Sequence, residues 1–234
     1  MTVARRTQQL SVLIMSTTAF TMCFAAWMLF AVIGIPIKEL LALNETQFGL
    51  LIATPVLTGS LVRLPLGIWT DRFGGRVVFF ALMLATVPPI FLISYATEYW
   101  QFLLAGLFVG LAGGSFSVGI AYCARWFERD QQGFAMGVFG AGNSGAAVTK
   151  LVAPILLVTF GWQFVPMVFA GAMLITAIAF WFFTYEDPAH RISSATTLAD
   201  QLKVLRDPRV WKYCQYYSIV FGGYVALALW MTKY

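Results

Sequence analysis

Charge is scarce in this sequence of 234 residues, because only 11% of them are charged and 60% are hydrophobic. A soluble domain carries about a quarter charged residues. Five stretches carry no charge, and each reaches the ~20 residues that an α-helix needs to cross a bilayer: 7–37, 77–97, 99–124, 151–185 and 213–232. The composition excludes soluble, disordered, collagen-like and disulfide-rich secreted proteins, and it predicts an all-α integral membrane protein.

Cysteine and histidine are also scarce. Cys23, Cys123 and Cys214 lie in or beside apolar segments without metal-ligand spacing, and His190 is the one histidine. The sequence has no HExxH, GxSxG or nucleotide-binding loop. It therefore predicts no metal, no cofactor and no enzyme. The net charge of +5 comes from basic residues scattered through short loops, which argues against a nucleic-acid partner.

Six apolar spans with short loops precede a longer polar stretch. We expect the spans at about 10–35, 47–70, 77–96, 100–122, 134–160 and 164–184, and a seventh beginning near Trp211. The first span is expected to stop at Pro36. This arrangement is typical of one six-helix half of a twelve-helix transporter. We therefore predict an N-terminal six-helix domain (1–184), a cytoplasmic linker (185–209) and the first helix of a truncated C-terminal domain (210–234), with the missing C-terminal half as a partner.

The loop charges predict the orientation in the membrane. A cytoplasmic N-terminus leaves only Lys38 clearly outside, and cytoplasmic loops are the ones that collect Lys and Arg. The protein is therefore expected to cross the plasma (inner) membrane several times, surrounded by lipid. The cationic residues then placed in the cytoplasm are Arg5, Arg6, Arg72, Arg76, Arg125, Arg129, Arg191, Lys203, Arg206, Arg209 and Lys212.

The loop after the second span contains the pattern Gly67-x-x-x-Asp71-Arg72-x-Gly74-x-Arg76. We expect Gly67 to let helices approach closely, Asp71 to interact with a helix end or a cation, and Gly74 with the following glycine to permit a tight turn. The pattern resembles the signature between the second and third helices of the major facilitator superfamily. That resemblance implies a latch that holds one conformation on the cytoplasmic side. A positively charged turn without such a role is the alternative.

Only two charged residues lie within the first six spans, and both are cations, Arg63 and Lys150. Ionisable residues at membrane depth are costly and mark functional sites. Two buried cations without a carboxylate repel each other unless an anion lies between them, so the sequence predicts an anionic substrate. The guanidinium fork of Arg63 suits a planar oxyanion. Partner acids from the missing half are the alternative.

The fifth span carries a run of small residues before Lys150. Gly140, Asn143, Ala147 and Lys150 fall on one face of a continuous helix, which would let a ligand or another helix reach the backbone. Packing of small residues between helices is the other interpretation. The shared face of Asn143 and Lys150 favours a functional role.

Together with Arg63, the run Gly140-x-Gly142-Asn143-x-Gly145 resembles the nitrate signature of the nitrate/nitrite porter family, and Lys150 resembles its proton-coupled importers. The resemblance implies that Phe116, Tyr217 and Phe221 also face the anion, although Phe116 and Phe221 could equally be core or lipid-facing rings. It implies import of nitrate by alternating access with proton symport, for which Lys150 is the candidate proton carrier. Nitrate/nitrite antiport and a non-transporting membrane assembly subunit are the alternatives.

Overall fold

The computed structural model describes residues 3–186 and 203–230, and within these ranges the chain is helical and contains no strand. This confirms the all-α prediction. The α-helices and the three 3₁₀ helices are α1 (Val3–Trp27), α2 (Phe30–Leu40), α3 (Glu45–Leu61), α4 (Arg63–Phe73), α5 (Gly75–Ile93), α6 (Tyr99–Val109), η1 (Gly110–Gly114), α7 (Ser115–Ala124), α8 (Gln132–Gly140), η2 (Ala141–Ser144), α9 (Gly145–Phe160), α10 (Phe164–Phe183), η3 (Lys203–Arg206) and α13 (Pro208–Trp230).

Six helical stretches of the described chain are long and apolar enough to cross a membrane, which confirms the six predicted spans. The helix α13 has 23 residues but does not belong to these six. Most of the predicted linker, with His190 and Arg191, lies outside the described residues. The six spans are Arg5–Leu40, Glu45–Phe73, Gly75–Ile93, Tyr99–Ala124, Gln132–Phe160 and Phe164–Phe183.

Four of the six spans are interrupted helices. The first is broken at residues 28–29, the second at Val62, the fourth at η1 and the fifth at η2. The expected stop at Pro36 was wrong, because Pro36 lies inside α2, which continues to Leu40. Bundle neighbours compensate for a proline within a transmembrane helix. A break displaces the part of a span that follows it relative to the part that precedes it. Backbone atoms at the break can therefore lie close to a neighbouring helix.

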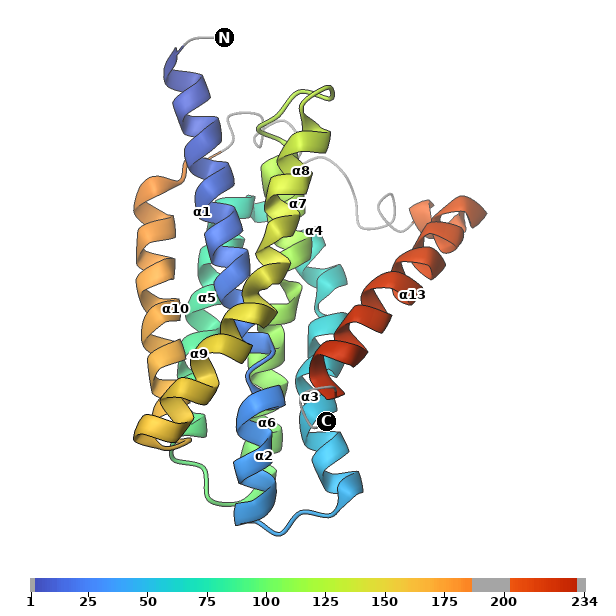
Figure 1. Ribbon diagram of the computed structural model, residues 1–234. Helices are drawn as coiled ribbons and strands as arrows, with labels where there is room; N and C mark the ends of the chain where they lie inside the picture. Colours follow the sequence, from blue (N-terminus) through green and yellow to red (C-terminus); the bar gives the residue numbers. More distant parts are fainter. Residues whose placement is uncertain (1–2, 187–202, 231–234) are drawn as a thin grey trace.

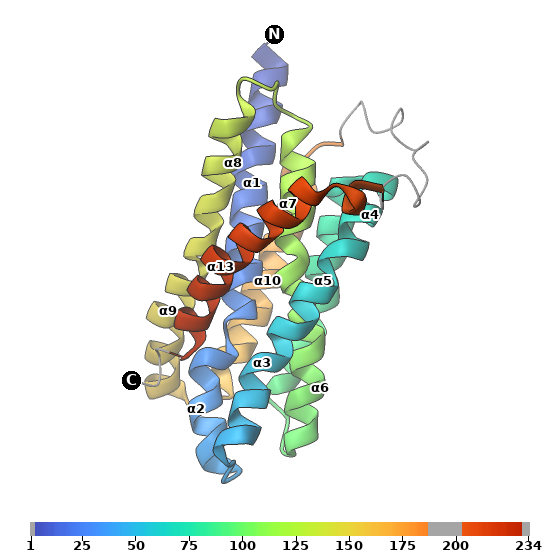
Figure 2. The same cartoon turned by 90° about the vertical axis from the view of Figure 1, so that its right-hand side faces the viewer.

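The first span forms the centre of the bundle, with α5, α7, α9 and α10 packed around it (Figures 1 and 2). Residues 23–34 are all buried. The Trp27 indole N–H donates to the Pro55 carbonyl at 2.8 Å and ties the first span to the second. A Cβ at Gly59 or Gly113 would lie within 3 Å of this indole. Trp27 therefore fills the place where the first, second and fourth spans meet.

The segments predicted to be cytoplasmic meet at one end of the bundle (Figure 1). The Gln9 amide donates to the Trp126 carbonyl at 2.5 Å, and Asp71 forms an ion pair with Arg125 at 2.5 Å. The α2–α3 and α5–α6 connections lie at the opposite end. This common end is what the predicted topology requires, and the side of the membrane on which it lies stays a prediction.

The helix α13 crosses the bundle obliquely. Its first turns stand away from the other helices, whereas its last turns lie against them (Figures 1 and 2). Residues 211–220 are exposed, and the buried residues Val225, Ala228 and Leu229 all belong to the last turns. The space between α13 and the second span is therefore wider toward the start of α13.

Candidate functional site

A cavity of about 450 Å³ lies between the second span and α13. Trp27 and Ser60 line it from the first two spans, and Tyr217, Phe221 and later residues of α13 line the other side. Among the residues that line it, all within the described chain, Arg63 is the one charged side chain. The cavity is therefore apolar with a single fixed cation.

The break at Val62 places Arg63 at the first position of α4. Its Nε lies 3.4 Å from the Gly113 carbonyl, which is a long and weak hydrogen bond. The guanidinium carbon lies 5.0 Å from the ring centroid of Phe221 and 6.0 Å from that of Phe116. No carboxylate forms an ion pair with Arg63 in the part of the chain that the structure describes. In the described chain the guanidinium lies beside aromatic ring faces, the Gly113 carbonyl and the Tyr217 hydroxyl, none of which neutralises its charge, so it can attract an anion.

Three aromatic rings form a wall beside the guanidinium. Tyr217 and Phe221 stack with centroids 5.1 Å apart and planes at 13°, and Phe116 stacks on Tyr217 at 6.1 Å and 22°. An apolar wall excludes water and strengthens the attraction between a cation and an anion. The structure thus brings together Arg63, Phe116, Tyr217 and Phe221, four of the residues that the sequence marked for the site.

Two glycines of the fifth span, Gly142 and Gly145, serve helix packing in this structure. A Cβ at Gly142 would lie 2.3 Å from the Phe20 ring, and a Cβ at Gly145 would lie 2.3 Å from the Thr21 carbonyl oxygen. A Cβ at Gly140 would meet nothing within 4 Å. The packing interpretation therefore accounts for Gly142 and Gly145, which let η2 and α9 approach α1.

Asn143 lies at the break itself. Its side-chain N–H donates to the Gly140 carbonyl at 2.9 Å, and its buried Oδ1 has no hydrogen-bond partner in the described chain. Its backbone carbonyl accepts a hydrogen bond from the Tyr224 hydroxyl at 3.2 Å. Asn143 thus connects the fifth span to α13 at its backbone, beside the cavity but not among its lining residues.

Lys150 does not join Arg63. Its side chain is exposed on α9, it does not line the cavity, and it forms no ion pair within the described residues. The predicted common face with Gly140 and Asn143 assumed a continuous α-helix. η2 interrupts that α-helix, and the binding role of Lys150 stays a prediction.

Asp71 and Gly74, two residues of the loop pattern after the second span, lie as expected. Asp71 pairs with Arg125 at the end of α7, which agrees with the expectation that it meets a cation. Gly74 has φ of +90°, so it makes the turn as expected. Within the described residues no helix approaches Gly67, because a Cβ there would meet nothing within 4 Å, so its predicted role stays a prediction. The close approach occurs at Gly75, where a Cβ would lie 2.4 Å from Tyr122.

The loop arginines differ in their contacts. Arg72 is exposed, with its guanidinium 5.3 Å from the Phe73 ring. Arg76 donates to the Trp181 carbonyl at 2.5 Å, and its guanidinium lies 4.4 Å from the Trp181 ring. Carbonyl groups in the last turn of a helix have no partner within the helix. Arg76 therefore caps the end of α10 within this half of the molecule.

Two further donors reach the same helix end. The Ser11 hydroxyl donates to the Phe183 carbonyl at 2.6 Å, and the Tyr122 hydroxyl donates to the Tyr185 carbonyl. The end of α10 is thus held from three other spans. These partners, like Trp27 and Tyr224 near the cavity, escaped the sequence analysis because no local pattern marks a contact between distant segments.

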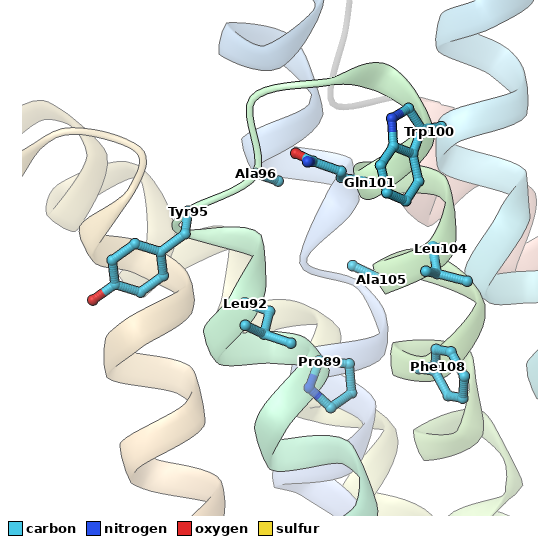
Figure 3. A pocket seen from close by; sticks show the side chains of 9 residues that line it. All are labelled: Pro89, Leu92, Tyr95, Ala96, Trp100, Gln101, Leu104, Ala105 and Phe108. Atoms are coloured by element: carbon cyan, nitrogen blue, oxygen red, sulfur yellow. The ribbon is translucent and has the colours of Figure 1, made fainter.

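A second cavity, of about 330 Å³, lies between α5 and α6 (Figure 3). It is lined mainly by apolar side chains such as Pro89, Leu92 and Phe108. Its one amide, Gln101, accepts from the backbone N–H groups of Thr97 and Glu98 at the start of α6. This cavity has no charged side chain, so the Arg63 cavity is the better candidate for an anion.

Comparison with known proteins places the chain in a family. The family described as the Major Facilitator Superfamily matches residues 15–234. The "Probable nitrate/nitrite antiporter NarK1" of Thermus thermophilus is 44% identical over 98% of this chain and 54% of its own length. The "Probable nitrate/nitrite transporter NarK2" of Mycobacterium tuberculosis is 32% identical over 95% of this chain and 57% of its own length.

The chain spans about half the length of the curated relatives it matches. A solved bacterial homologue of the human lysosomal transporter Spinster has a TM-score of 0.69 and 18% identity, over 77% of this chain and 44% of its own. This likeness supports the fold. Six membrane-spanning stretches and these relatives make the chain part of a multi-pass membrane protein, which in bacteria lies in the inner membrane. The chain belongs to the major facilitator superfamily, and within it these two relatives carry the names of nitrate/nitrite transporters.

Proposed function

We propose that the full-length protein transports a small planar monovalent anion, nitrate or nitrite, by alternating access. One observation carries the proposal. Arg63 lines the 450 Å³ cavity beside the aromatic wall, and it has no carboxylate partner in the described chain. A guanidinium offers two parallel N–H donors, which match the oxygens of a planar oxyanion. The names of the relatives, which include a "Nitrite extrusion protein" of Bacillus subtilis, support this anion class.

Uptake by proteoliposomes tests this function directly. Vesicles with the full-length protein are expected to take up nitrate, and nitrite is expected to compete because it shares the charge and the planar oxygens. Tetrahedral sulfate is expected not to compete. Protein-free vesicles are the control for leakage. No uptake above that control under either a pH gradient or nitrite preloading would reject transport and favour a membrane assembly subunit.

We further propose that transport is import driven by proton symport, with Lys150 on the proton route. An inside-negative potential opposes entry of a monovalent anion by about 2.3 kcal/mol per 100 mV. One accompanying proton cancels this opposition, and with more than one the potential itself drives import. An ammonium can give up its proton, whereas a guanidinium keeps it. Lys150 lies outside the Arg63 cavity, so its role here is proton transfer and not direct binding of the anion.

Lys150→Arg separates symport from exchange. The variant keeps the positive charge and removes practical proton release. We expect it to lose nitrate accumulation driven by a pH gradient and to retain exchange of external nitrate for internal nitrate. The measurement is uptake with and without the gradient. Lys38→Arg is the matched control, because Lys38 lies in the last turn of α2, where it pairs with Glu45.

Full proton-driven accumulation by Lys150→Arg would contradict the role of Lys150. Antiport remains the second candidate, because the 44% identical relative is named an antiporter. It predicts a different result for the unmodified protein. Internal nitrite would then accelerate nitrate entry, and a pH gradient alone would drive no accumulation.

A further inference from the structure

The break in the fifth span leaves a backbone carbonyl that accepts a partner from another helix. η2 has 3₁₀ geometry, whose backbone hydrogen bonds are less well aligned than those of an α-helix. The Asn143 carbonyl lies within η2 and accepts a hydrogen bond from the Tyr224 hydroxyl at 3.2 Å. A carbonyl oxygen has two lone pairs, so it can take this bond as well as one from its own helix. The 3₁₀ segment η2 thus provides a hydrogen-bond acceptor for α13.

The Tyr224 hydroxyl adds a directional hydrogen bond to a contact that otherwise consists of packed aromatic rings. Its ring stacks on Phe24 with centroids 6.4 Å apart and planes at 19°, and Phe221 lies 6.4 Å from Phe24 at 57°. Dispersion contacts between rings allow sliding with little loss. A hydrogen bond to a carbonyl demands a narrow range of distance and angle. The Tyr224 bond therefore defines the position of α13 along the fifth span.

Tyr224 also has a defined place relative to the cavity. It follows Tyr217 by seven residues, which is about 10 Å along the helix and away from the end that carries the 71–76 loop. Tyr217 and Phe221 line the cavity, whereas the first turns of α13 stand away from the bundle (Figures 1 and 2). The packed part of α13 lies farther from the 71–76 loop than Tyr217 does, and residues on both sides of Tyr224 along α13, up to Trp230, line the cavity.

We propose that the hydrogen bond from Tyr224 to the Asn143 carbonyl holds α13 against the fifth span beside the Arg63 cavity, so that α13 diverges from the bundle only toward the 71–76 loop. It thereby favours the conformation in which the cavity opens toward that loop. The inference rests on the proposed transport function, in which the cavity must open to each side in turn. Tyr224 is a positioning residue, because it acts on the angle between α13 and the fifth span and is not a lining residue of the cavity.

Tyr224→Phe tests the bond alone. The variant keeps the ring contacts with Phe24 and Phe221 and removes the hydroxyl. One neutral hydrogen bond is worth about a two- to tenfold change in an equilibrium. We therefore expect the ratio of loop-side-open to loop-side-closed molecules to fall two- to tenfold. Tyr216→Phe is the matched control, because Tyr216 lies on the same helix and is 62% exposed.

The populations are measured as distances between two spin labels by pulsed double electron–electron resonance. The labels occupy exposed Asp130 and Lys212 in the full-length protein in lipid nanodiscs, with exposed Cys214 replaced by serine. Cys23 and Cys123 are buried. No anion is added. The long-distance population is expected to shrink in Tyr224→Phe and to stay unchanged in Tyr216→Phe.

An unchanged distance distribution in Tyr224→Phe would overturn the proposal. Equal shifts in both tyrosine variants would overturn it as well, because the effect would not belong to the Asn143 bond. Tyr224 is 41% exposed, so folding is expected to survive the loss of its hydroxyl, and the apparent melting temperature checks this. Since the measurement contains no anion, a failure of nitrate uptake would reject the proposed substrate and leave the distance result intact.

Discussion

Replacing Arg63 by lysine is expected to weaken nitrate binding by one to two orders of magnitude while the protein still inserts and folds. Lysine keeps the positive charge beside the Phe116 and Phe221 rings but loses the planar pair of donors. The loss of a hydrogen bond to a charged group costs about 1.5–3 kcal/mol, which corresponds to this change in affinity. Uptake rates at increasing nitrate concentration in proteoliposomes, together with direct binding in detergent, measure the effect.

Arg129→Lys is the matched control for Arg63→Lys, because Arg129 is exposed in the loop before α8, outside the cavity. It is expected to transport nitrate as the unmodified protein does. Wild-type affinity and rate in Arg63→Lys would show that Arg63 serves the fold, through the Gly113 carbonyl and the neighbouring rings, and not the anion.

Gly145→Ala is expected to lower the stability of the bundle strongly. The added Cβ would lie 2.3 Å from the Thr21 carbonyl oxygen and 2.8 Å from the Ala25 nitrogen. Both are backbone atoms, so no side-chain rotation relieves the clash, and α9 must move away from α1. Overpacking of a core costs about 1–3 kcal/mol, and occasionally more. The apparent melting temperature and the monodisperse fraction after detergent extraction measure the loss.

Gly140→Ala provides the comparison for Gly145→Ala within the same run. A Cβ at Gly140 meets nothing within 4 Å, so this variant is expected to be as stable as the unmodified protein. Equal stability of both variants would contradict the packing role of Gly145. Normal stability of Gly145→Ala combined with lost nitrate binding would instead support the substrate-binding role that the sequence motif suggested.

Hydropathy predicted the six spans because a helix in lipid must satisfy its own backbone groups, so long apolar stretches can hardly adopt another structure. The interruptions within the spans were not predicted. Pro36 suggested a stop, yet α2 continues through it, and the actual breaks fall at residues 28–29, at Val62 and within η1 and η2. Whether a glycine-rich stretch becomes 3₁₀ depends on how closely its neighbours approach, and this is a tertiary property.

The candidate site was predicted unevenly for the same reason. Arg63 and the three rings of the wall carry chemistry that the sequence displays, and the fold brings them together. Lys150 does not line the Arg63 cavity, and its role in transport stays a prediction. Arg125 was predicted only as a cytoplasmic cation, because its pairing with Asp71 joins residues 54 positions apart. The binding roles assigned to Gly140, Gly142, Asn143 and Gly145 stay predictions.

The anchored end of α10 fixes the point at which the chain leaves the six-helix bundle. Ser11, Arg76 and Tyr122 hold the carbonyl groups of the last turn and of Tyr185. Chain length alone limits the distance from residue 186 to residue 203 to about 60 Å. This covalent limit keeps η3 and α13 near the bundle when contacts between α13 and the bundle break.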